Sequence, residues 1–558
     1  MKTTKRLSIA AVLLAALLPF GLSAKSAKQK LSGTVINPAS TAIGIITDAQ
    51  TGEPIVGVPV TDGYSYTATD RNGVYQMTLA DSARMVYYSL PRDYAVNLDE
   101  KTRRPAFYSS RPLSRDSVNR IDFQLTRLDA PEEEITLLMI GDPQCRYDAD
   151  LMRYLNETLP DVSKTVTEGQ YPNVYAFTLG DLTWDNVVMW PRVSKAMRSI
   201  EADGREIPVF NCVGNHDHDA AKDNDYDALH NYVRLLGPTD YSINRGQTHI
   251  VVMDDIYCTH KRKPTTWTYK GGFTPRQVEW LRQDLATVEN PEETDVVLCV
   301  HIPFRDDTEL FQREVMEMLS SFRNAHIMTG HTHYQQPWIH SDFTSASGAA
   351  VYEHIHGAAC GAWWTCNSNT DGQPNGYNIY SFNDSGLQNW IAKSVGKPLD
   401  EQMRVWNGSQ LFGDRYPMSW AAGGDGGSEK TKVRGDNRLD SCFVVELWND
   451  DGPMSKADTL TRSTWEVDLV LADGRVLPME RLNHRIAMIP AAAYFFNEVE
   501  RKGGNFFKPT RYVWYVKAPS GDPAEEQGWT VRARQTIPTS GAVNEYTCSV
   551  LTTDYDCF

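Results

Sequence analysis

The stretch ITLLMIGDPQ, residues 135–144, joins an apolar run to two polar side chains, Asp142 and Gln144. The same arrangement returns along the chain up to residue 333, always as a short apolar run followed by residues that can bind a metal ion. The runs have the length of buried strands and span Ile135–Ile140, Val174–Leu179, Ile207–Val213, Val296–Val300 and His326–Thr329. The residues after them are Asp142, Gln144, Asp181, Asn215, His216, Asp217, His301, His331 and His333. Because ligands bind beyond the carboxyl ends of strands in open α/β sheets, this pattern predicts a site for two metal ions.

The surrounding segment, residues 133–390, alternates strands with helical stretches, which indicates an α/β layer fold. The start of one helix is clear. Thr274 is placed as its N-cap, Pro275 as its first residue and Gln277 as the partner in a capping box. Phe273 and Val278 are spaced to form a hydrophobic staple around this start. We therefore expect a helix packed on a sheet from residue 275 onward.

Both flanks of this segment are β-rich. Residues 31–130 contain short alternating runs separated by turn signals such as Asp62-Gly63 and Asn72-Gly73, which predicts a small β-sandwich. The stretch from residue 44 to residue 77 is similar to carboxypeptidase-regulatory-like modules and carries no catalytic constellation. Residues 395–558 return to β character, with strands expected over Thr464–Leu471, Tyr512–Lys517 and Trp529–Gln535. We expect a second β-sandwich domain there.

The length of the chain, its net charge and its first residues indicate the number of domains, the kinds of partner and the cellular location. A chain of 558 residues predicts roughly two to four domains. Its net charge of -16 disfavours nucleic acid and anionic membranes as partners. Lys2, Lys5 and Arg6 precede an apolar stretch, Leu7–Phe20, that is too short for a transmembrane helix. We interpret residues 1–24 as a signal peptide and expect an exported protein, periplasmic, at the cell surface or secreted.

The nine cysteines allow disulfides without requiring them. Cys360 with Cys366, and Cys548 with Cys557, are close enough in sequence to pair. Four others lie in or next to expected strands and are expected to be buried free thiols: Cys145, Cys212, Cys258 and Cys299.

The ordered motifs resemble those of the calcineurin-like metallophosphoesterase superfamily. That family has Asp-x-His/Gln, Gly-Asp, Gly-Asn-His-Asp/Glu, a lone His and Gly-His-x-His in this order, and the match here runs from Asp142 to His333. The whole chain is similar to exported bacterial forms, common in Bacteroidota, in which this catalytic domain lies between amino- and carboxy-terminal β modules. The resemblance implies an α/β sandwich of two β-sheets flanked by helices, with a β-sandwich at either end.

The resemblance also implies a role for each residue of the motifs. One divalent ion would be held by Asp142, Gln144, Asp181 and His333, and the other by Asp181, Asn215, His301 and His331. Asp181 would bridge the two ions, a hydroxide between them would be the nucleophile, and His216 would protonate the leaving alkoxide. Manganese, iron, zinc and magnesium all remain candidates. Gln144 replaces the histidine of many members, which favours harder ions over zinc.

Other residues have weaker predicted roles. Many phosphatases of this type carry an aspartate at the position of Trp184 to orient the catalytic histidine, so Asp185, Asp217 or neither takes that role here. Arg146 and Arg305 follow metal motifs and are candidates to bind a phosphate. Trp363 and Trp364 either stack on a ring of the substrate or seal the domain to its neighbour. The sequence suggests solvated loop positions for His218, Asp219, Asp254 and Asp255, and ordinary strand or loop positions for His354 and His356.

Three functions are consistent with these residues. The first is a secreted phosphoesterase with two metal ions that hydrolyses small-molecule or head-group phosphates, with phosphomonoesters favoured. The second is a phosphodiesterase acting on small or lipid head-group diesters. The third, from a different class, is a surface protein that binds a glycan or other ligand and retains a vestigial metal site.

Overall fold

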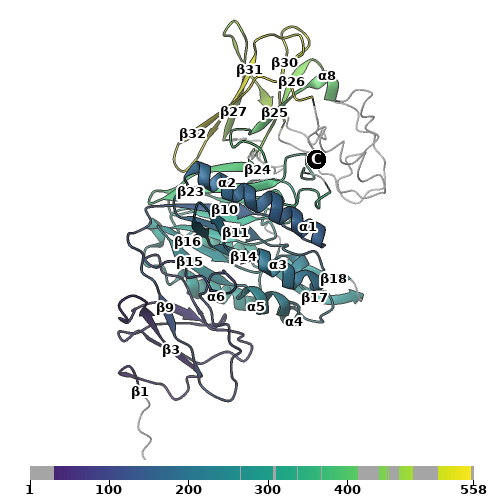
Figure 1. The fold of residues 1–558 in the computed structure, drawn as a ribbon. Coiled ribbons are helices and arrows are strands. Elements are labelled where there is room, and N and C mark those ends of the chain that lie inside the picture. Colours follow the sequence, from purple (N-terminus) through teal and green to yellow (C-terminus); the bar gives the residue numbers. More distant parts are fainter. Residues whose placement is uncertain are drawn as a thin grey trace, which may run out of the picture.

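The computed structural model describes residues 30–263, 266–305, 309–335, 337–365, 367–411, 439–448, 450, 464–481 and 513–553. The expected signal peptide, Cys366 and Cys557 lie outside these residues. The chain forms a central layered domain with a β-rich module at either end (Figure 1). None of the helices in the described ranges is long and apolar enough to cross a membrane.

The first sheet of the central domain has five strands in the order β14-β11-β10-β23-β24. Strands β10, β11 and β14 run parallel, the later strand β23 pairs antiparallel with the edge of β10, and β24 pairs antiparallel with β23. The strands span Val209–Cys212 (β14), Val174–Leu179 (β11), Glu134–Ile140 (β10), Gly376–Asn383 (β23) and Gly386–Ser394 (β24). The sheet therefore continues beyond residue 390, where the sequence suggested that the domain ends.

The second sheet has six strands in the order β15-β16-β19-β20-β22-β21. Its four central strands are parallel, and both edge strands are antiparallel. The strands span Tyr241–Arg245 (β15), Thr248–Val252 (β16), Asp295–Cys299 (β19), Ala325–Thr329 (β20), Ala350–Ile355 (β22) and Trp338–Thr344 (β21).

The strands carry apolar side chains on both faces of each sheet, so one face of each sheet packs against the other sheet and the opposite face packs against helices. Leu137 and Met139 of β10 share one core with Val297 of β19 and Met328 of β20. The opposite face of the first sheet packs on helices α1 (Asp148–Arg153), α2 (Leu159–Gly169), α3 (Trp190–Ala196) and α5 (His230–Leu236). The outer face of the second sheet packs on α6 (Pro275–Leu285) and α7 (Gln312–Leu319). The four layers confirm the predicted sandwich of two sheets flanked by helices.

Helix α6 begins as the sequence predicted. The hydroxyl of Thr274 accepts a hydrogen bond from the backbone N–H of Gln277, and the Gln277 side chain accepts one from the backbone N–H of Thr274. Phe273 and Val278 are both buried in the same core. A capping box of this kind stabilises a helix by about 1 kcal/mol.

Short elements link these layers. They are the π-helical turn Tyr154–Thr158, the 3₁₀ turns Val187–Met189, Asn215–Asp217 and Pro291–Glu293, helix α4 (Asp225–Ala228), and the hairpins β12 (Ile200–Ala202) with β13 (Arg205–Ile207) and β17 (Ile256–Lys263) with β18 (Thr266–Gly271).

The amino-terminal module is two small sheets that pack together. One sheet contains β6 (Val74–Met77), β3 (Ala42–Asp48), β8 (Asn119–Arg120) and β9 (Phe123–Leu125), and the other contains β5 (Tyr66–Ala68), β4 (Pro59–Thr61) and β7 (Tyr87–Tyr88). A short hairpin of β1 (Lys30–Leu31) and β2 (Thr34–Val35) precedes them. The module is joined to the second sheet by a bridge between Leu90 and Ile243, and its core runs without a break into that of the central domain.

The carboxy-terminal module consists of two four-stranded sheets around a core of its own. The first contains β25 (Met403–Asn407), β26 (Cys442–Leu447), β30 (Val513–Lys517) and β29 (Glu480–Arg481), and the short helix α8 (Gly408–Leu411) follows β25. The second contains β28 (Val476–Pro478), β27 (Trp465–Val470), β31 (Thr530–Thr536) and β32 (Val543–Cys548). Strands β27, β30 and β31 confirm the three predicted strands to within a residue at each described end. The module rests on β24, where Asn544 donates a hydrogen bond to Asn389 at 2.6 Å.

Candidate metal centre

The predicted metal ligands gather where the two sheets meet, at the carboxyl ends of their parallel strands. Asp142 and Gln144 follow β10, Asp181 follows β11, and Asn215 follows β14. The second sheet contributes its histidines from the ends of β19 and β20, namely His301, His331 and His333. The sandwich thus brings together side chains that are far apart in the sequence.

One half of the cluster is built around Asp142. Its carboxylate accepts a hydrogen bond from the backbone N–H of His331 at 3.0 Å, and its Oδ1 lies 3.6 Å from His333 Nε2. The amide of Gln144 donates to Asp181 Oδ2 at 3.1 Å. These side chains are almost fully buried. Oxygen and nitrogen donors therefore converge on a small volume shielded from solvent.

The other half is built around His301. Its Nε2 lies 3.3 Å from Asp181 Oδ1, 3.1 Å from Asn215 Oδ1 and 3.2 Å from His331 Nδ1. Asp181, His301 and His331 together have the spacing of metal ligands. The Asp181 carboxylate faces Gln144 through one oxygen and His301 through the other, so this one side chain touches both halves.

Two of the histidines are oriented for ligation by the backbone. Nδ1 of His301 lies 2.7 Å from the carbonyl oxygen of Leu179, and Nδ1 of His333 lies 3.2 Å from that of Gly361. A ring that donates from Nδ1 to a carbonyl presents the lone pair of Nε2 to the cluster, as metal-bound histidines do. The donor set and its orientation fit divalent cations.

The backbone at the cluster is strained in a way that the sequence does not reveal. Five of the expected ligands have positive φ: Asp142 (42°), Gln144 (39°), Asp181 (50°), His331 (68°) and His333 (55°). Left-handed backbone at a non-glycine residue costs of the order of 1–3 kcal/mol and persists where the surrounding structure enforces it. The sharp turns after the strands direct these side chains inward.

Two glycines of the motifs make room for this packing. A Cβ at Gly214 would lie 2.3 Å from Asp181 Oδ1, and one at Gly180, where φ is 88°, would lie 2.5 Å from His301 Nδ1. Any larger residue would push a ligand out of the cluster. The Gly in Gly-Asp and in Gly-Asn-His-Asp is thus a requirement of close approach.

His216 lies at the opening of the cluster and has a defined partner. Its Nδ1 is 3.0 Å from Asp185 Oδ1, and its side chain is 26% exposed. Burial lowers the pKa of His216, but the carboxylates of Asp181 and Asp185 outweigh this and raise it to about 9. Asp185 is therefore the residue that orients His216.

Asp217 contacts the backbone of two loops and not the ring of His216. Its buried carboxylate accepts backbone hydrogen bonds from Leu182, Thr183 and Gly214 at 3.1, 2.9 and 2.9 Å. It ties the loop that carries Asp181 to the loop that carries Asn215 and His216. This contact fixes the two loops relative to each other.

Burial and mutual charge set the protonation of the cluster. Burial raises the pKa of Asp142 to about 7. Burial also acts on Asp181, but the neighbouring His301 and His216 lower the pKa of Asp181 below its usual range. Burial and the charge of His301 lower the pKa of His331 to about 3. A bound cation favours ionised carboxylates and neutral imidazoles, so it would relieve the cost of burying Asp142 charged.

Aromatic side chains form a rim beside His216 and His333. The Trp184 ring is centred 5.8 Å from that of His216 and 5.9 Å from that of Trp363, which itself lies 5.1 Å from His333. The guanidinium of Arg146 stacks on Trp184 at 4.6 Å. Trp184, which the sequence singled out only as a missing aspartate, is thus part of a wall next to the site. We call Arg146, Trp184 and Trp363 the aromatic rim.

The remaining suggested substrate residues lie in different places. Arg305 donates to the hydroxyl of Tyr334 at 2.8 Å, next to His333. Trp364 is 6% exposed and its indole N–H donates to the carbonyl oxygen of Pro143 at 2.9 Å. Because its ring packs in the core under α1, the structure assigns Trp364 to packing instead of substrate contact.

Several loop residues that the sequence suggested to be solvated are buried. Asp255 accepts backbone hydrogen bonds from His301 at 3.1 Å and Ile302 at 2.9 Å, so it holds the His301 loop in place. Asp254 and His218 are 3% and 1% exposed, whereas Asp219 is half-buried. The signal was present in the sequence, because Asp254 and Asp255 follow an apolar run, THIVVM, in the same way as the metal motifs do.

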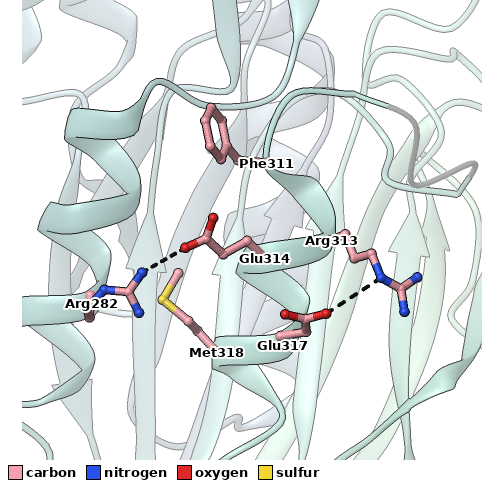
Figure 2. Close-up of a pocket in the computed structure, with 6 residues that line it drawn as sticks. All are labelled: Arg282, Phe311, Arg313, Glu314, Glu317 and Met318. Atoms are coloured by element: carbon pink, nitrogen blue, oxygen red, sulfur yellow. Dashed lines mark hydrogen bonds and ion pairs between the residues drawn. The ribbon is translucent and has the colours of Figure 1, made fainter.

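A surface hollow elsewhere on the domain is unrelated to this cluster. It lies between α6 and α7 and is lined by charged side chains that already pair, Arg282 with Glu314 at 2.7 Å and Arg313 with Glu317 at 3.6 Å (Figure 2). We assign no role to it.

Several solved structures resemble parts of this chain at low sequence identity. The NAD nucleotidase of Haemophilus influenzae shares 9% identity, with 47% of this chain and 50% of that chain covered and a TM-score of 0.27. PhoD shares 9%, with 60% and 78% covered and a TM-score of 0.32, and the 5'-nucleotidase of Candida albicans shares 10%, with 48% and 53% covered and a TM-score of 0.28. The chain thus spans about half the length of both nucleotidases. No curated protein matches the sequence.

Family profiles match nearly every part of the chain described above. Residues 135–335 match "Calcineurin-like phosphoesterase", residues 41–128 match "N terminal of Calcineurin-like phosphoesterase", and residues 353–537 match "C terminal of Calcineurin-like phosphoesterase". The matched catalytic segment contains all of the clustered ligands. The chain therefore belongs to the calcineurin-like phosphoesterases, in the form that carries dedicated amino- and carboxy-terminal modules.

Proposed function

We propose that this protein is an exported phosphoesterase that requires two divalent metal ions and hydrolyses phosphomonoesters. The observation that carries the proposal is the convergence of seven donors on one point, six of them buried and His331 partly exposed, with the His216–Asp185 pair beside them at the opening. A cluster that only stabilised the fold would not need a half-exposed histidine with an oriented ring at its mouth.

The proposed ligands divide into two sets that share Asp181. Asp142, Gln144, Asp181 and His333 would hold one ion, and Asp181, Asn215, His301 and His331 the other. Paired ions, when bound, stabilise negative charge on phosphate oxygens and lower the pKa of water so that hydroxide is present at neutral pH. The protein's own contribution is to fix these donors through Asp217, Asp255 and the carbonyls behind the histidines.

His216 is the proposed proton donor to the leaving group. Its Nδ1 is directed to Asp185, which leaves Nε2 for the substrate. The Asp185 carboxylate at Nδ1 favours the protonated form of the ring. A protonated imidazole can stabilise the charge that develops on phosphorus-bound oxygens and then protonate the departing alkoxide.

The aromatic rim suggests what the ester carries. Trp184 and Trp363 are half-buried aromatic rings next to His216 and His333, and Arg146 adds a positive charge over Trp184. Flat rings stack on such surfaces with a gain of about 1–3 kcal/mol. We therefore propose a phosphate ester whose leaving group contains a ring, such as an aryl alcohol or a nucleoside.

The test is phosphate release from matched substrates. Chelated protein is reloaded singly with manganese, iron, zinc or magnesium and assayed with aryl phosphate, nucleoside monophosphate, glycerol phosphate and bis-aryl phosphate. We expect metal-restored activity that prefers the first two substrates and is lost in Asp181→Ala. Trp363→Ala should raise KM for the ring-containing monoesters and leave KM for glycerol phosphate unchanged.

Other results would assign a different function. Faster hydrolysis of the bis-aryl ester than of the monoester would replace the proposal by a phosphodiesterase. Metal-replete protein that is inert on all four esters yet retained on a glycan array would favour a binding protein with a vestigial site.

Export rests on the basic residues before Leu7–Phe20 and the small residues after them. Expression of the full chain in a bacterial host should yield a mature protein whose amino terminus lies near residue 25 in the periplasmic fraction. A cytosolic protein that begins at Met1 would contradict this part of the proposal.

A further inference from the structure

A second group of metal-ligating side chains lies outside the catalytic cluster. Nε2 of His218, a carboxylate oxygen of Asp225 and the Sγ of Cys258 are all within 4.8 Å of one another. Asp254 adds another oxygen, because its Oδ2 lies 3.6 Å from His218 Nε2. None of these residues belongs to the ligand sets proposed above.

We propose that His218, Asp225, Asp254 and Cys258 form a structural site for a zinc-like divalent cation. The bonds of about 2.0–2.3 Å in tetrahedral zinc sites place the ligand atoms roughly 3.3–3.8 Å apart. His218 Nε2 lies 3.6 Å from Asp254 Oδ2 and 4.0 Å from Asp225 Oδ1. The Sγ of Cys258 lies within 4.8 Å of the ligand atoms of His218 and Asp225, so side-chain movements of up to about 1 Å would bring the four donors to tetrahedral spacing.

The ligands are oriented by neighbouring backbone groups. His218 Nδ1 lies 3.0 Å from the carbonyl oxygen of Gly214, which directs Nε2 into the cluster. Asp225 Oδ1 accepts the backbone N–H of Cys258 at 3.0 Å, and Asp254 Oδ1 accepts that of Ile256 at 2.9 Å. Each of these three side chains thus has its direction fixed by a second partner, as is usual around bound metals.

Burial and charge also favour a cation. The side chains of His218 and Asp254 are 0% and 4% exposed, and Cys258 is buried. Two carboxylates in one largely enclosed place carry more negative charge than a single imidazolium can balance, and burying unbalanced charge is costly. Asp225, at 28% exposure, leaves a route from solvent. The mixture of sulfur, nitrogen and oxygen donors suits zinc better than magnesium or calcium.

The position of the group explains what the ion would do. His218 follows the Asn215–Asp217 turn of the catalytic cluster, Asp225 begins α4, and Cys258 is on β17, the strand beside α4 (Figure 1). Through Gly214, the site is joined to the loop that presents Asn215 and His216. A cation here would hold the loop after Asn215–Asp217, helix α4 and strand β17 together, next to the loop that presents Asn215 and His216.

Cobalt reports on this site separately from the catalytic one, whose proposed ligands contain no sulfur. Full-length protein is stripped with chelator, reloaded with cobalt(II), and examined for a near-ultraviolet sulfur-to-cobalt charge-transfer band. We expect the band in wild type and in Cys299→Ala, which removes another buried strand thiol. Cys258→Ala should lose the band and bind one ion fewer per chain.

The charge-transfer band of the wild-type protein tests the proposal even if the variants misfold. Wild type that binds cobalt without a thiolate band, or equal ion counts in Cys258→Ala and Cys299→Ala, would overturn the proposal. His218 would then be an imidazolium paired with two carboxylates. Neither outcome depends on whether the protein hydrolyses phosphate esters.

Discussion

At the scale of single residues, the contact between His216 and Asp185 decides how well a leaving group is protonated. We expect His216→Ala to lower kcat by about 10²–10⁴-fold. Asp185→Asn should lower kcat by less than this, because the ring remains but its orientation and charge are no longer supported. Steady-state kinetics on an aryl phosphate, with Asp219→Asn as the control in a nearby loop, measures both. A kcat for Asp185→Asn equal to that of the control would show that Asp185 has no positioning role.

The residues of this site differ in how far the sequence could predict them. The ligands are predictable because each ends an apolar run in a fixed order of motifs. The partner of His216 was not, since Asp185, 31 residues away, and the adjacent Asp217 were both candidates, and only the turn after β11 brings Asp185 to the ring. Asp255 was missed although it follows an apolar run as the metal ligands do, because an aspartate that accepts backbone hydrogen bonds belongs to no recognised motif.

At the scale of elements, β22 buries histidines between the two sheets. His354 lies on this strand and His356 directly follows it, with Nδ1 2.8 Å from the carbonyl oxygen of Thr329 and Nε2 2.9 Å from the hydroxyl of Tyr380. Burial lowers the pKa of His356 to about 4 and that of His354 well below its usual value. These rings are therefore neutral in the folded protein at pH 5–7.

This burial predicts a loss of stability in mild acid. Below about pH 6.5 the unfolded chain protonates His356 while the folded chain does not until about pH 4, so the free energy of unfolding falls by about 1.4 kcal/mol per pH unit between them. Denaturant unfolding of chelated protein from pH 7 to pH 5 should show a shallower decline in His356→Gln than in wild type. The exposed His230→Gln should follow wild type, and equal slopes in all three would contradict the prediction.

Most strands and helices could be predicted from the sequence, but the pairing of distant strands within a sheet could not. Apolar runs predicted β10, β11, β19 and β20, and the capping signals predicted the start of α6. The sequence expected one strand over Ile207–Val213, whereas Pro208 separates β13 from β14. Nothing local indicates that β23 and β24 would complete the first sheet, because their pairing with β10 is a contact between distant segments.

At the scale of the whole molecule, a buried arginine joins the amino-terminal module to the catalytic domain. Arg245 is fully buried, pairs with Glu132 at 3.2 Å, and donates to the carbonyl oxygens of Pro91 at 2.8 Å and Tyr94 at 2.6 Å. Removal of the guanidinium would leave a buried carboxylate and two carbonyls without their donor.

We expect Arg245→Leu to destabilise the protein by about 3–5 kcal/mol. The matched control is Arg92→Ala, which removes an exposed contact with Gln247 across the same interface and should cost less than about 1 kcal/mol. Denaturant unfolding of both variants, followed by tryptophan fluorescence, gives the two values. Similar small losses in both would mean that the module is attached without contributing to the stability of the catalytic domain.

The order of strands in the first sheet also determines when β10 can complete its pairing during synthesis. Strand β10 forms one of its two ladders with β23, in which Leu137 pairs with Tyr380. Until the ribosome has delivered β23, one edge of β10 has no partner, although the second sheet up to β22 is already complete. The unpaired edge of an apolar strand can pair with other chains and cause aggregation. Pairing between segments that are distant in the sequence is also slow to form. We therefore expect the nascent chain to be prone to aggregation until β23 has been made, and a truncation between the last metal motif and β23 would leave that edge of β10 permanently open.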